Sequence, residues 1–246
     1  MKRVLIIGAT SAIAVACARQ WATEKSEFVL VARNQDKLDQ VSADLTSRGA
    51  AQVTVHVMDA NDTAAHVPML NATVEALRQI DIVLIAHGTL PDQQQCQASA
   101  EVALQEFANN GTSVIALLTV ISNQMEVQRC GTLAVISSVA ADRGRPSNYL
   151  YGAAKAAVST FCEGLRARMA KVGVHVMTIK PGFVDTPMTQ GLKLPQALVT
   201  SPEKVATLIT SHIEKGTNVL YAPRFWQLIM LIIRCVPQFV FKKLNL

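Results

Sequence analysis

This sequence of 246 residues lacks paired cysteines and clustered histidines. The five cysteines are odd in number, widely spaced and without a C-x-x-C pair, which is typical of reduced thiols in a cytosolic protein. The five histidines show neither H-x-x-x-H nor H-E-x-x-H spacing, so we expect no metal site. No stretch interleaves Lys and Arg with aromatic residues, which argues against a nucleic-acid groove.

The composition is that of a globular protein, because half of the residues are apolar and 17% are charged. This excludes a disordered chain, a collagen-like repeat and a small disulfide-stapled scaffold. Of the 23 Lys and Arg residues, four lie in 217–246, where there is no acid, so the rest of the chain has 19 basic against 18 acidic residues. We expect one domain over 1–223 and a basic tail over 224–246.

The first residues imitate a secretory signal, because Met1-Lys-Arg3 precedes apolar and small residues. We reject a signal peptide, since the apolar run Val4–Ile7 ends at once in Gly8-Ala-Thr-Ser11. Cleavage near Ala16 would also delete the first predicted strand. We therefore expect a cytoplasmic protein.

Short β-branched runs alternate with segments long enough for helices. Near-continuous apolar strands of this kind predict a parallel sheet covered on both faces, a doubly wound, Rossmann-like α/β domain. Ligands of such sheets bind beyond the carboxyl ends of the strands. The predicted strands are Arg3–Ile7, Phe28–Ala32, Val53–Val57, Ile82–Ala86, Thr132–Ser137, His175–Lys180 and Val219–Ala222. The Gln-rich segment Leu90–Ser99 predicts a polar surface loop, and Thr186–Pro202, with three prolines, a mobile covering loop.

A nucleotide site is indicated after the first three strands. Gly8 opens a tight turn into a helix, whose N–H groups and positive dipole end suit a pyrophosphate, although an ordinary turn explains the segment equally well. Arg33 follows the second strand, at a position where an acid would favour NAD. A guanidinium there suits the 2′-phosphate of NADP(H). The alternative is that Arg33 is only a solubilising surface residue. Asp59 could accept from the adenine amino group or simply open a turn.

Catalytic chemistry is indicated by Ser138, followed thirteen residues later by Tyr151-Gly-Ala-Ala-Lys155. Tyr151 and Lys155 are four apart on a predicted helix and share a face. A free tyrosine has a pKa near 10, and we expect the Lys155 cation to lower it. Ser138 can hydrogen-bond a substrate carbonyl and hold it against Tyr151. Tyr149 is a weaker candidate, because Ala153 stands four residues after it.

With these motifs, residues 3–223 resemble the short-chain dehydrogenase/reductase family. The resemblance implies that Tyr151 is the general acid/base, that Lys155 lowers its pKa and holds the nicotinamide ribose, and that Ser138 orients the carbonyl. The family's asparagine for proton relay aligns with Asn110, with Asn109 as its near rival. The resemblance also implies a homodimer or homotetramer.

The same resemblance implies a set of cofactor-binding positions after the strands. Val184 and Thr186 would meet the nicotinamide amide, although a structural turn explains Pro181-Gly182 equally well. The sequence departs from the family where Ala12 and Ala14 replace glycines of the turn, and where Ile85-Ala-His-Gly88 replaces Asn-Asn-Ala-Gly. The expected cofactor contacts are Gly8, Thr10, Ser11, Ile13, Arg33, Asp59, Ala86, Gly88, Lys155, Pro181, Gly182, Val184 and Thr186.

The tail segment Phe225–Phe241 is almost entirely apolar. Its polar side chains Gln227, Arg234 and Gln238 fall on one helical stripe, and Pro237 should kink or end the helix. The segment is too short and too interrupted to span a bilayer, so we favour a helix in the membrane interface over burial against a second subunit or the substrate pocket.

The run from Arg145 to Lys155 and the Pro-Arg-Phe-Trp of the tail resemble the keto-reductase of the decaprenylphosphoryl-ribose 2′-epimerase type. That resemblance implies NADPH-dependent reduction of a 2-keto sugar on a polyprenyl phosphate, at the cytoplasmic face of a membrane. Two alternatives stay open. One is a soluble carbonyl or 3-oxoacyl reductase with a buried tail, and the other is a nucleotide-binding protein without turnover.

Overall fold

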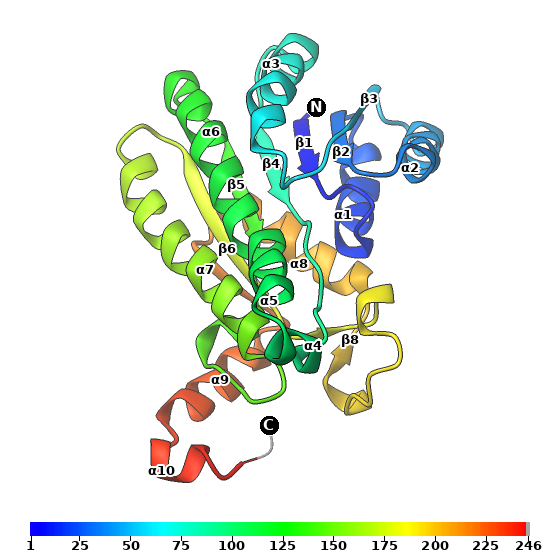
Figure 1. The fold of residues 1–246 in the computed structure, drawn as a ribbon. Helices are drawn as coiled ribbons and strands as arrows, with labels where there is room; N and C mark the ends of the chain where they lie inside the picture. Colours follow the sequence, from blue (N-terminus) through cyan, green and yellow to red (C-terminus); the bar gives the residue numbers. More distant parts are fainter. Residues whose placement is uncertain (245–246) are drawn as a thin grey trace.

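The fold is built on a seven-stranded parallel sheet (Figure 1), in a computed structural model that describes residues 1–244. The strand order is β3-β2-β1-β4-β5-β6-β9, and every neighbouring pair is parallel. This confirms the predicted Rossmann-like α/β fold, with strand ends within a residue or so of those expected. The strands are β1 (Arg3–Ile7), β2 (Glu27–Ala32), β3 (Gln52–Val57), β4 (Ile82–Ile85), β5 (Thr132–Ile136), β6 (His175–Pro181) and β9 (Val219–Ala222).

Helices cover both faces of the sheet and bury two separate cores. Alternation along β1 shows the division, because Val4 and Ile6 belong to one core while Leu5 and Ile7 belong to the other. Strands buried on both faces explain the continuous apolar runs. The first core is covered by α1 (Ala12–Ala22), α2 (Gln35–Ser47) and α8 (Pro202–Glu214), and the second by α3 (His66–Leu77), α6 (Ser113–Gln128) and α7 (Tyr149–Ala170).

The strand order reverses between β1 and β4, so the segments after these strands meet at the carboxyl edge of the sheet. The contact is so close that it requires glycine. Gly8 has a φ of +81°, and a Cβ there would lie 2.4 Å from the backbone nitrogen of His87. The glycine turn therefore lets the backbones after β1 and β4 lie side by side.

The segment Leu90–Ser99 is not the polar surface loop that the sequence predicted. It contains a helix, α4 (Gln93–Ala98), in which Gln93 and Cys96 are buried. The side chain of Asp92 caps this helix by accepting a hydrogen bond from the backbone N–H of Gln94. The capping residue and one buried side of the helix outweigh the polar composition.

The helical segment that contains Asn110 is interrupted. A π-helical turn over Ala108–Thr112 separates α5 (Ala100–Phe107) from α6. Asn110 is fully buried in this turn. Such turns widen a helix locally and often occur at functional sites.

The predicted covering loop, Thr186–Pro202, has some regular structure. Its strand β8 (Val199–Thr200) pairs in parallel with β7 (Phe183–Val184). Short 3₁₀ turns lie at Pro187–Thr189 and Gln196–Leu198, and two more at Thr63–Ala65 and Val139–Asp142. The mobility of the loop stays a prediction.

The tail forms α9 (Phe225–Cys235) and α10 (Gln238–Phe241), separated at Pro237 as expected. One side of α9 packs on the domain, where Trp226 and Met230 form a small core with Val139. Arg143 holds the end of α9, since its Nη1 donates to the carbonyl oxygens of Ile233 and Val236 at 2.5 and 2.7 Å. Among residues 1–244, no helix is long and apolar enough to cross a membrane.

The other side of the tail presents large apolar side chains to solvent. Leu228, Leu231 and Ile232 are 62%, 56% and 59% exposed. Phe239 of α10 is also exposed. We call the exposed apolar residues Phe225, Leu228, Leu231, Ile232, Phe239 and Val240 the tail face. A patch of this kind usually marks a surface that contacts a membrane or another protein.

Candidate active site

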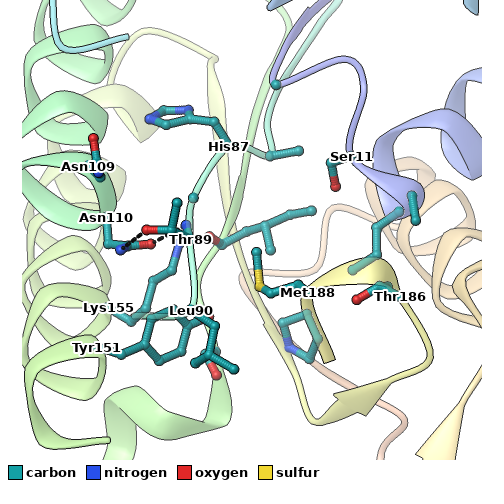
Figure 2. Close-up of a pocket in the computed structure, with 18 of the residues that line it drawn as sticks. Ser11, His87, Thr89, Leu90, Asn109, Asn110, Tyr151, Lys155, Thr186 and Met188 are labelled. Atoms are coloured by element: carbon teal, nitrogen blue, oxygen red, sulfur yellow. Dashed lines mark hydrogen bonds between the residues drawn. The ribbon is translucent and has the colours of Figure 1, made fainter. Parts of the chain in front are cut away.

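One cavity of about 430 Å³ lies at the carboxyl edge of the sheet. It collects every residue predicted for catalysis or cofactor binding, from the glycine turn after β1 to the segment after β6. Figure 2 shows Tyr151, Lys155 and Asn110 on one side of it and Ser11, Thr186 and Met188 on the other. The predicted residues are therefore brought together in space, which gives them a common site without assigning their roles.

Tyr151 and Lys155 lie on successive turns near the start of α7. They share a face, as the spacing predicted, with the Lys155 Nζ 5.8 Å from the centre of the Tyr151 ring. Lys155 is buried, and its Nζ donates to the carbonyl oxygen of Ile136 at 3.1 Å. Burial lowers the pKa of Lys155 to about 8.

The pKa of Tyr151 differs from the expectation. Burial raises it above its usual value, and a hydrogen bond with Ser138 opposes the rise only in part. Lys155 makes no contribution to this shift. A phenol with a raised pKa stays protonated at neutral pH.

Two serines at the end of β5 have different tasks. Ser137 is buried and structural, since its Oγ donates to the backbone oxygen of Lys155 at 3.0 Å and pairs with Ser159 at 2.8 Å. Ser138 lines the cavity, and its Oγ accepts from the backbone N–H of Ala140 at 3.1 Å. A hydroxyl that accepts from the backbone still has its proton to donate into the cavity.

Asn110 is held in place by Thr89, just after β4, as the dashed lines in Figure 2 show. The Thr89 N–H donates to Asn110 Oδ1, and Asn110 Nδ2 donates to Thr89 Oγ1, both at 3.0 Å. Asn110 Nδ2 also donates to the carbonyl oxygen of Glu106 at 3.1 Å. Thr89 Oγ1 in turn donates to the Glu106 carboxylate. The rival Asn109 pairs instead with Asn61, although it also borders the cavity.

The start of α1 fits a phosphate group. Ser11 at the N-cap forms no side-chain hydrogen bond, and the first turn contains no acid. The N–H groups at this helix end are therefore not capped by side chains, and Thr10, Ser11 and Ile13 line the cavity. Backbone N–H donors at a positive dipole end suit a dinucleotide diphosphate.

The residues predicted for the adenosine end of the cofactor follow β2 and β3. Arg33 and Asp59 both line the cavity and are otherwise exposed. Asp59 accepts from the N–H of Asn61 at 2.9 Å, so it also opens a turn, as the alternative interpretation held. No carboxylate stands at the end of β2, where Asn34 caps α2 instead.

At the opposite end, Gly182 contacts the tail. A Cβ on Gly182 would lie 1.9 Å from Nε1 of Trp226, so this position has room for glycine alone. Trp226 stacks edge-to-face on Phe183, with 5.0 Å between the ring centres. The Pro-Gly segment is therefore positioned by α9 as well as by β6.

The chain matches the description "short chain dehydrogenase" over residues 2–197. It belongs to the short-chain dehydrogenase family. Its members are oxidoreductases that use NAD(P)(H) on CH–OH and C=O groups. An uncharacterised oxidoreductase of Mycobacterium tuberculosis is 34% identical over 241 residues, which are 98% of this chain and 96% of that protein. One from Streptomyces coelicolor is 31% identical over 244 residues, 99% of this chain and 96% of that protein.

Two solved structures share the fold. An actinorhodin polyketide ketoreductase with NADPH has a TM-score of 0.80 at 20% identity, covering 89% of this chain and 95% of that one. An NAD⁺-bound xylitol dehydrogenase has a TM-score of 0.79 at 19% identity, covering 89% and 96%. At this identity the likeness concerns the fold alone.

The departures from the family pattern have different consequences in this short-chain dehydrogenase. Ala12 borders the cavity, whereas Ala14 is fully buried in the first core. His87 borders the cavity at its backbone turn, and its Nε2 lies 3.0 Å from Ser113 Oγ on α6. Burial lowers the pKa of His87 to about 3, with a smaller contribution from Lys155, so its ring is neutral.

Sequence reasoning missed several lining residues. Arg145 and Asn148 lie in the loop before α7, and the apolar side chains are Leu90, Val139, Phe183, Met188 and Leu192. Most of these lie on loops whose path no local pattern reveals. Arg145 had one available signal, since it begins the run quoted for the keto-reductase resemblance.

Proposed function

We propose that this short-chain dehydrogenase reduces a ketone with NADPH, with Tyr151 as the proton donor. The observation that carries the proposal is the placement of Tyr151, Ser138 and Lys155 in one cavity with a phenol that stays protonated. The cofactor, when bound, supplies the hydride. The proton then comes from the chain.

Each side chain of the set has a defined task in this proposal. The Ser138 hydroxyl and the Tyr151 phenol both donate to the carbonyl oxygen, which holds and polarises the ketone. A reduced carbonyl oxygen is far more basic than a phenolate, so even a phenol of raised pKa can protonate it. Lys155, with its Nζ 5.8 Å from the centre of the Tyr151 ring, is proposed to hold the nicotinamide ribose beside the phenol. Asn110, held by Thr89, is proposed for the relay that returns the proton.

The preference for NADPH rests on Arg33. Its guanidinium lines the cavity after β2, where no carboxylate is present to bind a ribose 2′-hydroxyl or repel a phosphate. A guanidinium can bind a 2′-phosphate with two parallel hydrogen bonds. The other predicted contacts, which run from Gly8 after β1 to Thr186 after β6, are proposed to bind the rest of the cofactor.

The proton-donor role is tested by Tyr151→Phe, with Tyr149→Phe as the matched control on the same helix end. Tyr149 is exposed and does not border the cavity. We expect Tyr151→Phe to lower ketone-dependent NADPH oxidation by about 10²- to 10⁴-fold and Tyr149→Phe to leave it unchanged. Full turnover by Tyr151→Phe would refute the role. A cofactor-binding protein with no turnover on a broad ketone panel would support the non-catalytic alternative instead.

For the substrate, we propose a 2-keto sugar on a polyprenyl phosphate, reached at the cytoplasmic face of a membrane. The keto-reductase resemblance and the tail face support this substrate class. Residues 224–246 would contact the membrane, and residues 1–223 would form the catalytic domain, in a homodimer or homotetramer. We propose that this surface is an anionic bilayer, because the tail has basic residues and no acid beside its apolar side chains.

Flotation with liposomes tests the membrane contact, using two exposed leucines as a matched pair. Leu231→Glu places an acid on the tail face, whereas Leu104→Glu places it on α5. We expect the wild type and Leu104→Glu to float with phosphatidylglycerol vesicles and Leu231→Glu to stay behind. A wild type that never floats would favour the soluble carbonyl or 3-oxoacyl reductase.

A further inference from the structure

Arg145 is a cation in the cavity wall that forms no ion pair within residues 1–244. It lies in the loop between β5 and α7, six residues before Tyr151, and lines the same cavity as Tyr151 and Ser138. Its Nε is buried and donates to no acceptor in the part of the chain that the structure describes. A buried guanidinium donor without an acceptor is costly, so such groups normally meet an anion.

The nearest acid acting on Arg145 is already engaged. Asp142 lowers the cost of burying the Arg145 charge, but its Oδ1 accepts from Lys180 Nζ at 2.6 Å. Its Oδ2 accepts from the Tyr221 hydroxyl at 2.7 Å. No ion pair joins Arg145 to a carboxylate within residues 1–244. The charge of Arg145 therefore remains available to a ligand.

The charges lining the cavity are unevenly distributed. Asp59 is the acid among the lining residues, and it follows β3 at the edge of the sheet. Arg145 follows β5, four strands away, which is about 19 Å at the usual spacing of strands. Apart from Asp59, no acidic residue among 1–244 lines the cavity, so none accompanies Arg145 and Lys155 at the catalytic end. The potential at this end favours an anion.

Other residues that line the cavity define the rest of the ligand. Val139, Leu90 and Met188 are apolar, and Asn148 is polar. We propose that Arg145 binds an oxyanion group of the substrate, a carboxylate or a phosphate, and so selects anionic ketones that also carry an apolar part. This inference rests on the proposed ketone reduction. A planar guanidinium suits both oxyanions, because it can bind either with paired hydrogen bonds.

Paired substrates test the inference, with each anion compared with its neutral counterpart. Levulinate and its methyl ester form the carboxylate arm, and dihydroxyacetone phosphate and dihydroxyacetone form the phosphate arm. The variants are Arg145→Gln, Arg145→Lys and, as a charge-matched control, Lys171→Gln, which removes an exposed cation at the far end of α7. KM is measured with NADPH, and the Kd of the anion is measured by calorimetry on the NADP⁺-loaded protein.

We expect Arg145→Gln to raise the KM and Kd of the anion by about tenfold to hundredfold in at least one arm, with the neutral partner unchanged. Arg145→Lys should recover part of the lost affinity. Lys171→Gln should leave the KM and Kd of the anion unchanged. An equal effect on the anion and its neutral partner, or no effect in either arm, would overturn the inference. If no ketone is reduced, the proposed function fails, and the calorimetric arm alone decides whether Arg145 binds anions.

Discussion

The contact between Gly182 and Trp226 gives a quantitative prediction that links the cavity to the tail. Gly182→Ala adds a methyl group 1.9 Å from the Trp226 indole nitrogen, which is far inside van der Waals contact. Trp226 cannot move freely, because it is 2% exposed and packs on Phe183 and Val139. The substitution therefore has to displace α9 or the Pro181-Gly182 segment.

The expected loss in the free energy of unfolding differs between adding a methyl group and removing a buried ring. Overpacking by one methyl typically lowers the free energy of unfolding by about 1–3 kcal/mol, and we expect that loss for Gly182→Ala. Trp226→Ala removes a buried indole and should lose about 3–5 kcal/mol. In the double variant the methyl group no longer meets a ring. We expect the double variant to lose only about 3–5 kcal/mol in total, a coupling of about 1–3 kcal/mol.

Urea unfolding of the four proteins of this cycle measures the coupling, and NADPH titration of the same samples shows whether cofactor affinity follows it. Gly164→Ala is the control, because its added methyl group would meet nothing within 4 Å on α7 and should stabilise by about 0.5–1 kcal/mol. If the losses of the two single variants add within about 0.5 kcal/mol, the contact does not carry the energy assigned to it.

Three further predictions concern single side chains. Arg33→Ala should weaken NADPH binding by about tenfold more than NADH binding, measured by fluorescence titration, and equal losses would contradict the phosphate contact. His87 has a pKa lowered to about 3, so the wild type should lose up to about 2 kcal/mol of unfolding free energy between pH 6.5 and 5 as the unfolded state takes up the proton. His87→Gln should lack that loss in urea midpoints, and identical pH profiles would refute the assignment. Arg143→Ala removes the hydrogen bonds to the end of α9 and the stacking on Phe241, at 3.7 Å from its ring centre. Amide exchange should accelerate in α10 and not in α1.

Patterns local in the sequence predicted the fold and the shared helical face of Tyr151 and Lys155 well. The alternation of apolar strands and helical segments follows from burial on both faces, and β1 was placed to the residue. The four-residue spacing of Tyr151 and Lys155 fixes a common helical face without reference to the rest of the chain. The seven-stranded sheet and the shared cavity are consistent with both.

Features that depend on contacts between distant residues could not be predicted from local sequence patterns. The predicted lowering of the Tyr151 pKa was wrong, because burial raises this pKa and the hydrogen bond with Ser138 opposes the rise only in part. The helix α4 was missed because its Gln-rich sequence hides one buried side. The packing of Trp226 on Gly182 joins residues 44 positions apart, which no periodicity indicates.

The small core under α9 has one more consequence. Val139 and Phe183 belong to this core and also to the cavity wall, so the helix that carries the tail face shares two side chains with the site. Energetic coupling between two sites is reciprocal. A lipid surface or partner that binds and shifts this helix therefore changes the affinity of the cavity for its ligand. A bound ligand changes the affinity for that surface by the same factor.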